Sequence, residues 1–116
     1  MGFWTKLDQM LASHEIIIDR PKGSAHPGYP DMKYPLDYGY LKGTSSGDGN
    51  EIDVWRGSLD ENRLVAIICT VDTKKLDAEI KLLIACSDDE IDLVNRFQNL
   101  GEFMSGIVVR RDVELT

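Results

Sequence analysis

Short apolar segments separated by turn clusters constrain the fold of this chain most. Runs rich in apolar, aromatic and β-branched residues predict strands at 38–41, 51–56, 64–71 and 80–86. Clusters rich in Gly, Ser, Asp and Asn, such as SGDGN and SLDENR, divide these runs. Short strands separated by turns in this way are typical of a small antiparallel barrel.

Two helices are expected beside these strands. Apolar residues at helical spacing in 3–12 predict an amphipathic helix that packs on the barrel or on a neighbouring subunit. A second helix is predicted over 88–103, with Ser87 as its N-cap, acidic residues in its first turn and Gly101 near its end. Its buried stripe is expected to comprise Ile91, Val94, Phe97 and Leu100.

The remaining segments complete a single expected domain of 116 residues. Residues 16–18 are predicted as a buried strand, and 21–37, which hold all four prolines, as an extended loop. Residues 107–109 should form a last strand, and 110–116 an edge or a frayed end. The domain then consists of an N-terminal helix (1–13), a barrel core (14–86) with an acidic loop at 44–53, and a helix with a final strand (87–116).

Composition narrows the range of partners and compartments. Thirteen Lys and Arg against twenty Asp and Glu give a net charge of −7, which disfavours a nucleic-acid partner. No apolar run reaches the length of a membrane span, so no membrane partner is expected. Two cysteines without a signal peptide favour the cytoplasm. The sequence leaves open whether the chain forms a homo-oligomer.

The acidic loop concentrates oxygen ligands. Asp48, Asn50 and Asp53 lie around Gly49, which permits a turn with positive φ, so three side-chain oxygens can converge on one hard cation. The spacing suits Mg²⁺ or Mn²⁺. The alternative is a solvated hairpin loop, because Asp, Gly and Asn are ordinary turn residues.

Three motifs resemble those of the soluble family I inorganic pyrophosphatases. YPLDYGY and DGNEIDV are similar to that family's YPxNYGY and DGDPxDV, and IDRPKGS is similar to its EIPxGS, so the likeness covers roughly residues 17–86. The resemblance implies an α+β fold, mainly β with flanking helices, on a small five-stranded antiparallel barrel of the OB type. It also implies Mg²⁺-dependent hydrolysis of pyrophosphate or a related small phosphoanhydride.

The resemblance assigns roles to particular residues. Asp48 and Asp53 match metal-binding carboxylates of the family's loop, and Asp19 matches a metal-associated glutamate. Tyr38 and Lys81 match phosphate-contacting groups. A second acidic pair lies in VDTKKLDAEIK, where the register is ambiguous: Asp72 is its first member, and either Asp77 or Glu79 is the second, the ligand beside Lys81. Strand alternation would place Asp77, Glu79 and Lys81 on one face, which is either a pocket wall or a solvated strand face.

The sequence departs from the family at the expected general base and in the basic half of the site. Asn50 stands where the family has a carboxylate, and an amide cannot accept a proton at neutral pH; Glu51 could act only if the loop shifts. The family's basic hairpin is absent, and the available replacements are Arg20, Lys22, His26 and Lys33.

Three functions therefore compete. The first is a hydrolase of pyrophosphate or a small phosphoanhydride, with catalytic roles for Asn50, Glu51 and Asp53. The second is a binding module of the same fold that holds metal and phosphate but hydrolyses slowly. The third is an OB-type binder of single-stranded nucleic acid, which the net charge opposes.

Overall fold

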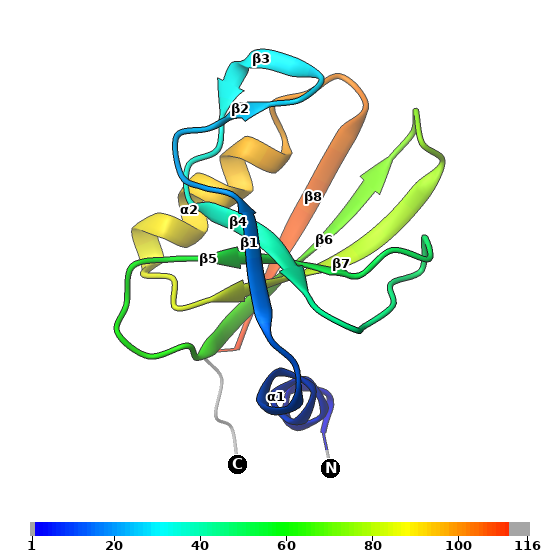
Figure 1. Ribbon diagram of the computed structural model, residues 1–116. Helices are drawn as coiled ribbons and strands as arrows, with labels where there is room; N and C mark the ends of the chain where they lie inside the picture. Colours follow the sequence, from blue (N-terminus) through cyan, green and yellow to red (C-terminus); the bar gives the residue numbers. More distant parts are fainter. Residues whose placement is uncertain (1, 112–116) are drawn as a thin grey trace.

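A six-stranded sheet with a helix against each of its two apolar sides forms the protein (Figure 1). This computed structural model describes residues 2–111. The chain runs through α1 (Phe3–Ser13), β1 (Ile16–Arg20), β2 (Ala25–His26), β3 (Tyr29–Lys33), β4 (Asp37–Leu41), β5 (Ile52–Arg56), β6 (Leu64–Asp72), β7 (Asp77–Ile84), α2 (Asp88–Gln98) and β8 (Met104–Arg110). None of its described helices is long and apolar enough to cross a bilayer.

The sheet has the strand order β1-β4-β5-β7-β6-β8. All neighbours are antiparallel except β5 and β7, which run parallel. The mainly β architecture with two helices confirms the expected fold class. The sheet has six strands rather than five, and among the described residues β1 and β8 stay at opposite ends of the order, so the ladder does not close into a barrel.

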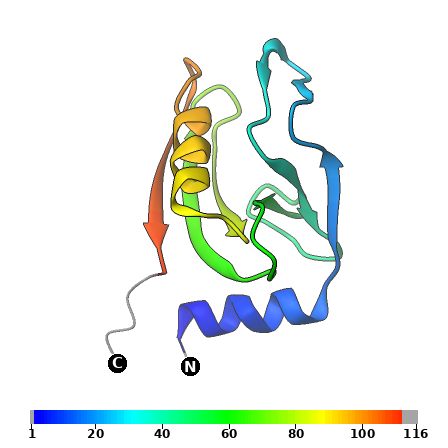
Figure 2. The same ribbon diagram turned by 90° about the vertical axis from the view of Figure 1, so that its left-hand side faces the viewer.

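Each side of the sheet has its own apolar cluster. On one side Trp55, Ile68 and Leu83 are fully buried and pack with the inner face of α2. On the other side Leu41, Val54, Leu82 and their neighbours are covered by the apolar stripe of α1, whose members are Trp4, Leu7, Met10 and Leu11. Figure 2 shows α1 crossing one end of the sheet, at the far end from the β2–β3 hairpin. The expected packing of the N-terminal helix on the β core is confirmed.

The segment 21–37 was expected to be an extended loop, and this expectation is wrong. Residues 25–33 form a small hairpin, β2 paired with β3, that turns at Pro27 and Gly28. Backbone hydrogen bonds hold its base, because the Tyr34 amide donates to the Ser24 carbonyl and the Gly23 amide donates to the Tyr34 carbonyl. Proline at the turn and on the exposed strand removes no ladder donor, so four prolines do not exclude pairing here.

Helix α2 begins as predicted but ends early. Ser87 caps it, accepting from the Glu90 amide while the Glu90 carboxylate accepts from the Ser87 amide. The predicted extent to residue 103 is wrong, since the helix stops at Gln98. Asn99 explains the stop: its side chain binds the backbone of Gly106 at both the amide and the carbonyl, which ties the chain to β8. Leu100 therefore lies outside the helix and is exposed.

Candidate active site

The site starts from three neighbouring strands that place Tyr38, Asp53 and Lys81 together. Tyr38 is on β4, Asp53 on β5 and Lys81 on β7. The strand register brings them side by side. Asp53 pairs with Tyr40, which shares a face of β4 with Tyr38, and the parallel pairing of Val54 with Leu82 places Asp53 beside Lys81. Both charged side chains point to the face of the sheet that carries Tyr38.

These three side chains form a closed hydrogen-bonded triangle. The Tyr38 hydroxyl donates to Asp53 Oδ2 at 2.6 Å, and the Lys81 ammonium donates to the same oxygen at 3.0 Å and to the Tyr38 hydroxyl at 2.8 Å. Lys81 is only 5% exposed. Burial, and next the neighbouring Asp53 carboxylate, raise the pKa of Tyr38 well above its usual value, so its hydroxyl stays protonated and remains a donor.

Close approach of β1 to β4 depends on Gly39. A Cβ at this position would lie 1.8 Å from the carbonyl oxygen of Ile17, so any other residue would push the strands apart. The same approach brings Arg20 of β1 to the site, where its guanidinium donates to the Tyr34 hydroxyl at 2.8 Å. The YPLDYGY motif thus supplies both a phenol partner and the glycine that lets β1 fit.

Three carboxylates gather beside the triangle. Ligand oxygens of Asp48, Asp77 and Glu79 all lie within 4.8 Å of one another. Asp48 comes from the loop before β5, which turns at Gly49 (φ 86°). Asp77 and Glu79 lie two residues apart on β7 and therefore on the same face of that strand. Burial is the largest cause that raises the pKa of Glu79; Lys81 opposes it, while Asp53, Asp48 and Asp77 raise the pKa further.

The donor set fits a hard divalent cation. It consists of carboxylate oxygens alone, which Mg²⁺ and Mn²⁺ prefer, and it holds neither the imidazole nor the thiolate that zinc favours. Burial is the main cause of the raised pKa of Glu79, and a cation there would relieve the smaller part that comes from repulsion among the carboxylates. The residues that could hold a metal in this structure are therefore Asp48, Asp77 and Glu79. Asp53 lies close enough to influence the pKa of Glu79, and its carboxylate accepts a hydrogen bond from Lys81.

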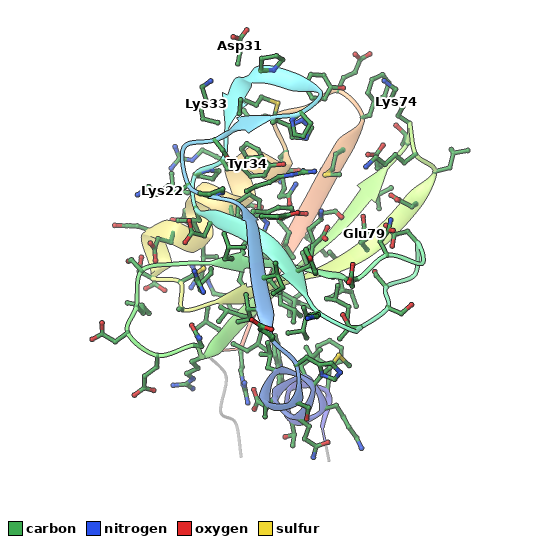
Figure 3. The ribbon with its side chains drawn as sticks, in the orientation of Figure 1. Lys22, Asp31, Lys33, Tyr34, Lys74 and Glu79 are labelled. Carbon is green, nitrogen blue, oxygen red and sulfur yellow. The ribbon has the colours of Figure 1, made fainter. Side chains whose placement is uncertain are left out.

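Carboxylates and cations share one cavity of about 800 Å³. Its acidic lining includes Asp19, Asp48, Asp53, Asp72 and Glu79, and Asn50 lines it as well. Its cationic lining comprises Arg20, Lys74, Lys75 and Lys81. Figure 3 shows Lys74 and Glu79 on the same side of the molecule.

Other predicted site residues take different places. Asp72 Oδ1 accepts from the amides of Lys74 and Lys75, and these hydrogen bonds, chiefly that from Lys75, lower its pKa. It therefore stabilises the β6–β7 turn, outside the three-carboxylate group. Asp19 is exposed on β1 and lines the cavity without joining that group. Both aspartates thus stay apart from the clustered ligand oxygens.

Three residues expected at the site do not line its cavity: Asp77, which belongs to the three-carboxylate group, and Lys22 and Glu51. Lys22 is exposed, and its amide donates to Asp37 Oδ1. In Figure 3 it lies on the opposite side of the molecule from Glu79, with Lys33 above it. Glu51, the alternative base, is half-buried and is not part of the lining. Lys22 and Glu51 therefore stand outside the set of residues that line the cavity.

Lys74 and Lys75 are the cavity cations that sequence reasoning missed. They occupy the turn between β6 and β7, in the VDTKKLDAEIK segment. The adjacent lysines at a turn between two predicted strands were the available signal. What the sequence could not give was the direction of that turn, which the Asp72 carboxylate fixes by holding both amides.

A model of the inorganic pyrophosphatase family matches residues 6–110. The chain belongs to the inorganic pyrophosphatase family. No curated protein sequence matches it significantly. The family match runs from within α1 to the end of β8 and therefore includes every residue that lines the cavity described above.

Solved bacterial structures share the fold at low sequence identity. The inorganic pyrophosphatase of Helicobacter pylori is 17% identical with a TM-score of 0.59, over 82% of this chain and 81% of that chain. The inorganic pyrophosphatase of Coxiella burnetii is 16% identical with a TM-score of 0.53, over 82% of each chain. A protein described as an inorganic phosphatase, from Anaplasma phagocytophilum, is 17% identical with a TM-score of 0.54, over 82% and 81%. At such identities the likeness concerns the pyrophosphatase fold.

Proposed function

We propose that this protein hydrolyses pyrophosphate, or a related small phosphoanhydride, to phosphate with Mg²⁺ or Mn²⁺ as cofactor. One observation carries the proposal: two members of the three-carboxylate group, Asp48 and Glu79, line the same cavity as the buried Lys81 ammonium in a chain of the pyrophosphatase family. Phosphoryl transfer needs charge that screens the anionic oxygens and donors that accept charge on the leaving phosphate. The cavity lining supports both requirements, because it contains carboxylates that could hold a screening cation and cationic side chains that could donate to phosphate.

Each residue has a proposed task. Asp48, Asp77 and Glu79 hold the cation, with Asp53 as a further ligand, and Mg²⁺ when bound supplies charge that screens phosphate oxygens and acidifies a water. Lys81 and Arg20 donate to phosphate oxygens, and partners in the cavity wall fix both of them in position. Tyr38 stays a protonated donor because burial raises its pKa. Lys74 and Lys75 add positive charge at the β6–β7 turn.

Asn50 is the observation that favours a second candidate function, a binding module with slow hydrolysis. Its amide lines the cavity where the family motif has a carboxylate, so it cannot take a proton from water. The backbone N–H of Asn50 donates to Asp48 Oδ1 at 3.0 Å, and its side-chain Nδ2 donates to Asp48 Oδ2 at 3.5 Å. A module that binds metal and phosphate but hydrolyses slowly is therefore the alternative to an active enzyme.

The test is phosphate release from pyrophosphate with Mg²⁺, compared among wild type, Asn50→Asp and Asp48→Asn. We expect Mg²⁺-dependent release by the wild type and at least a roughly tenfold rise for Asn50→Asp, because a positioned general base contributes about 10²–10⁴-fold. Asp48→Asn should lose most Mg²⁺ dependence. If neither wild type nor Asn50→Asp releases phosphate while both bind Mg²⁺ by calorimetry, the binding module replaces the hydrolase.

A further inference from the structure

The cavity extends well beyond its carboxylates, and the additional lining is aromatic. Beyond Asp48, Asp53 and Glu79 it is lined by His26, Tyr29, Met32, Lys74, Lys75 and Phe103, and we call these six residues the outer pocket; Glu102 lines the cavity as well. A cavity of about 800 Å³ falls in the range that holds drug-sized ligands, which is larger than pyrophosphate requires.

A series of aromatic rings connects the carboxylate end to the outer pocket. Tyr38, which binds Asp53, stacks on Tyr34 with 5.3 Å between centroids, and Tyr34 stacks on His26 at 5.9 Å with planes only 9° apart. His26 then contacts Tyr29 at 5.3 Å. The Gly28 amide donates to His26 Nδ1 and holds that ring in place. The hairpin β2–β3 therefore presents its rings to the cavity in fixed positions.

Two rings of the outer pocket remain open to a ligand. Tyr29 is 48% exposed and Phe103 is 37% exposed, although both line the cavity. Lys74 lies with its ammonium 5.5 Å from the centroid of the Phe103 ring, so an aromatic face and a cation are adjacent. Exposed aromatic faces beside cations are the surfaces on which nucleobases stack next to their phosphates.

Resting on the function proposed above, we propose that this cavity recognises a nucleoside polyphosphate, with its phosphates at the carboxylate end and its base on the rings of the outer pocket. A bound inorganic phosphate or pyrophosphate would leave the exposed faces of Tyr29 and Phe103 without contact to the ligand. An aliphatic tail is a poorer occupant, because Lys74 and Lys75 would contact hydrocarbon, whereas a base offers polar edges to them.

The test compares two non-hydrolysable ligands that share a methylene-bridged diphosphonate, of which one carries a nucleoside ester. Calorimetry with Mg²⁺ would measure the Kd of adenosine 5′-(α,β-methylene)diphosphate and of methylenediphosphonate. We expect the nucleotide to bind at least about fivefold more tightly, the factor that one stacked base supplies. Tyr29→Ala and the milder Tyr29→Leu should remove most of that gain and leave methylenediphosphonate binding unchanged. Phe3→Ala, an equally exposed ring on α1, is the control and should keep the gain.

Equal affinities for the two ligands, or a preference that survives both Tyr29 variants, would overturn the inference. A geranyl analogue that gains as much as the nucleotide would also overturn it, in favour of an apolar tail. The outcome is separable from the proposed function: pyrophosphate hydrolysis without nucleotide preference removes only this inference. Nucleotide preference without hydrolysis removes only the hydrolase.

Discussion

At the scale of single residues, the sequence motifs and the structure assign different primary partners to Asp53. The motif DGNEIDV pairs it with Asp48 as a metal ligand, whereas its Oδ2 accepts from both Tyr38 and Lys81. Spacing along one segment could indicate which residues carry oxygens. It could not indicate that a lysine on a strand distant in sequence would reach one of them, because that contact depends on the β5–β7 register.

Asp53→Asn should therefore lower stability even without metal. Its side chain is 26% exposed and that of Lys81 is 7% exposed, so the change leaves a mostly buried ammonium without its carboxylate. We expect a loss of about 2 kcal/mol in the free energy of unfolding, since breaking a partly buried pair costs more than breaking an exposed one. Urea unfolding with EDTA present measures it.

Asp48→Asn is the matched control for this change. Asp48 is exposed and its hydrogen bonds stay within its own loop, so an amide can replace it with a change below about 0.5 kcal/mol. Equal stability of the Asp53 and Asp48 variants would show that Lys81 does not depend on Asp53.

At the scale of elements, periodicity predicted helices and strands well and their ends less well. Ser87 and the acidic first turn set the start of α2 locally, and the structure agrees. The end of α2 depends instead on Asn99 binding Gly106 of β8, a contact that helical periodicity does not contain. The β2–β3 hairpin was missed for a similar reason, because its pairing is short and its prolines suggested a loop.

Ser87→Ala should destabilise the protein by about 1 kcal/mol, the usual effect of removing an N-cap side chain. Glu90 completes the capping box and its carboxylate also accepts from the Ser58 amide, so the cap ties α2 to the segment after β5. Thermal or urea unfolding measures the loss. Ser45→Ala, on the exposed loop before β5, should change stability little. A loss equally large in the control would mean that the cap itself is not responsible.

At the scale of the whole molecule, the short strands separated by turns were enough to predict the fold class from the sequence. The arrangement of the site could be predicted only in part. Residues within one motif, such as Asp77, Glu79 and Lys81, were expected on one face by alternation, and their positions agree with it. Lys74 and Lys75 enter the cavity through a turn whose direction is a tertiary property. Lys22 was expected as a substitute for the missing basic hairpin, but it lies in the turn after β1 and does not line the cavity.

The two ends of the described chain meet through one ion pair, which gives the last prediction. Arg111 donates to both oxygens of Asp8, at 2.7 and 2.6 Å, and so ties α1 to the segment after β8. The hydrogen bond from Arg111 is the largest cause that lowers the pKa of Asp8 from its usual 3.8. A lowered pKa in the folded state contributes stability above the unfolded value, near pH 4, and that contribution is lost as the pH falls through the folded value.

Asp8→Asn should thus cost stability at pH 7 and less at pH 2.5, because below the usual carboxyl value of 3.8 the unfolded wild-type chain takes up the proton first and the contribution of the lowered folded-state pKa declines. Because the Asp8 side chain is 45% exposed, we expect about 0.5–1 kcal/mol at neutral pH. Urea unfolding of both proteins at the two pH values measures the difference, with Asp31→Asn on the exposed β3 strand as the control (Figure 3). A difference that is the same at both pH values would mean that the Asp8 charge does not hold α1 in place, and that the apolar contacts of Trp4 and Leu7 suffice.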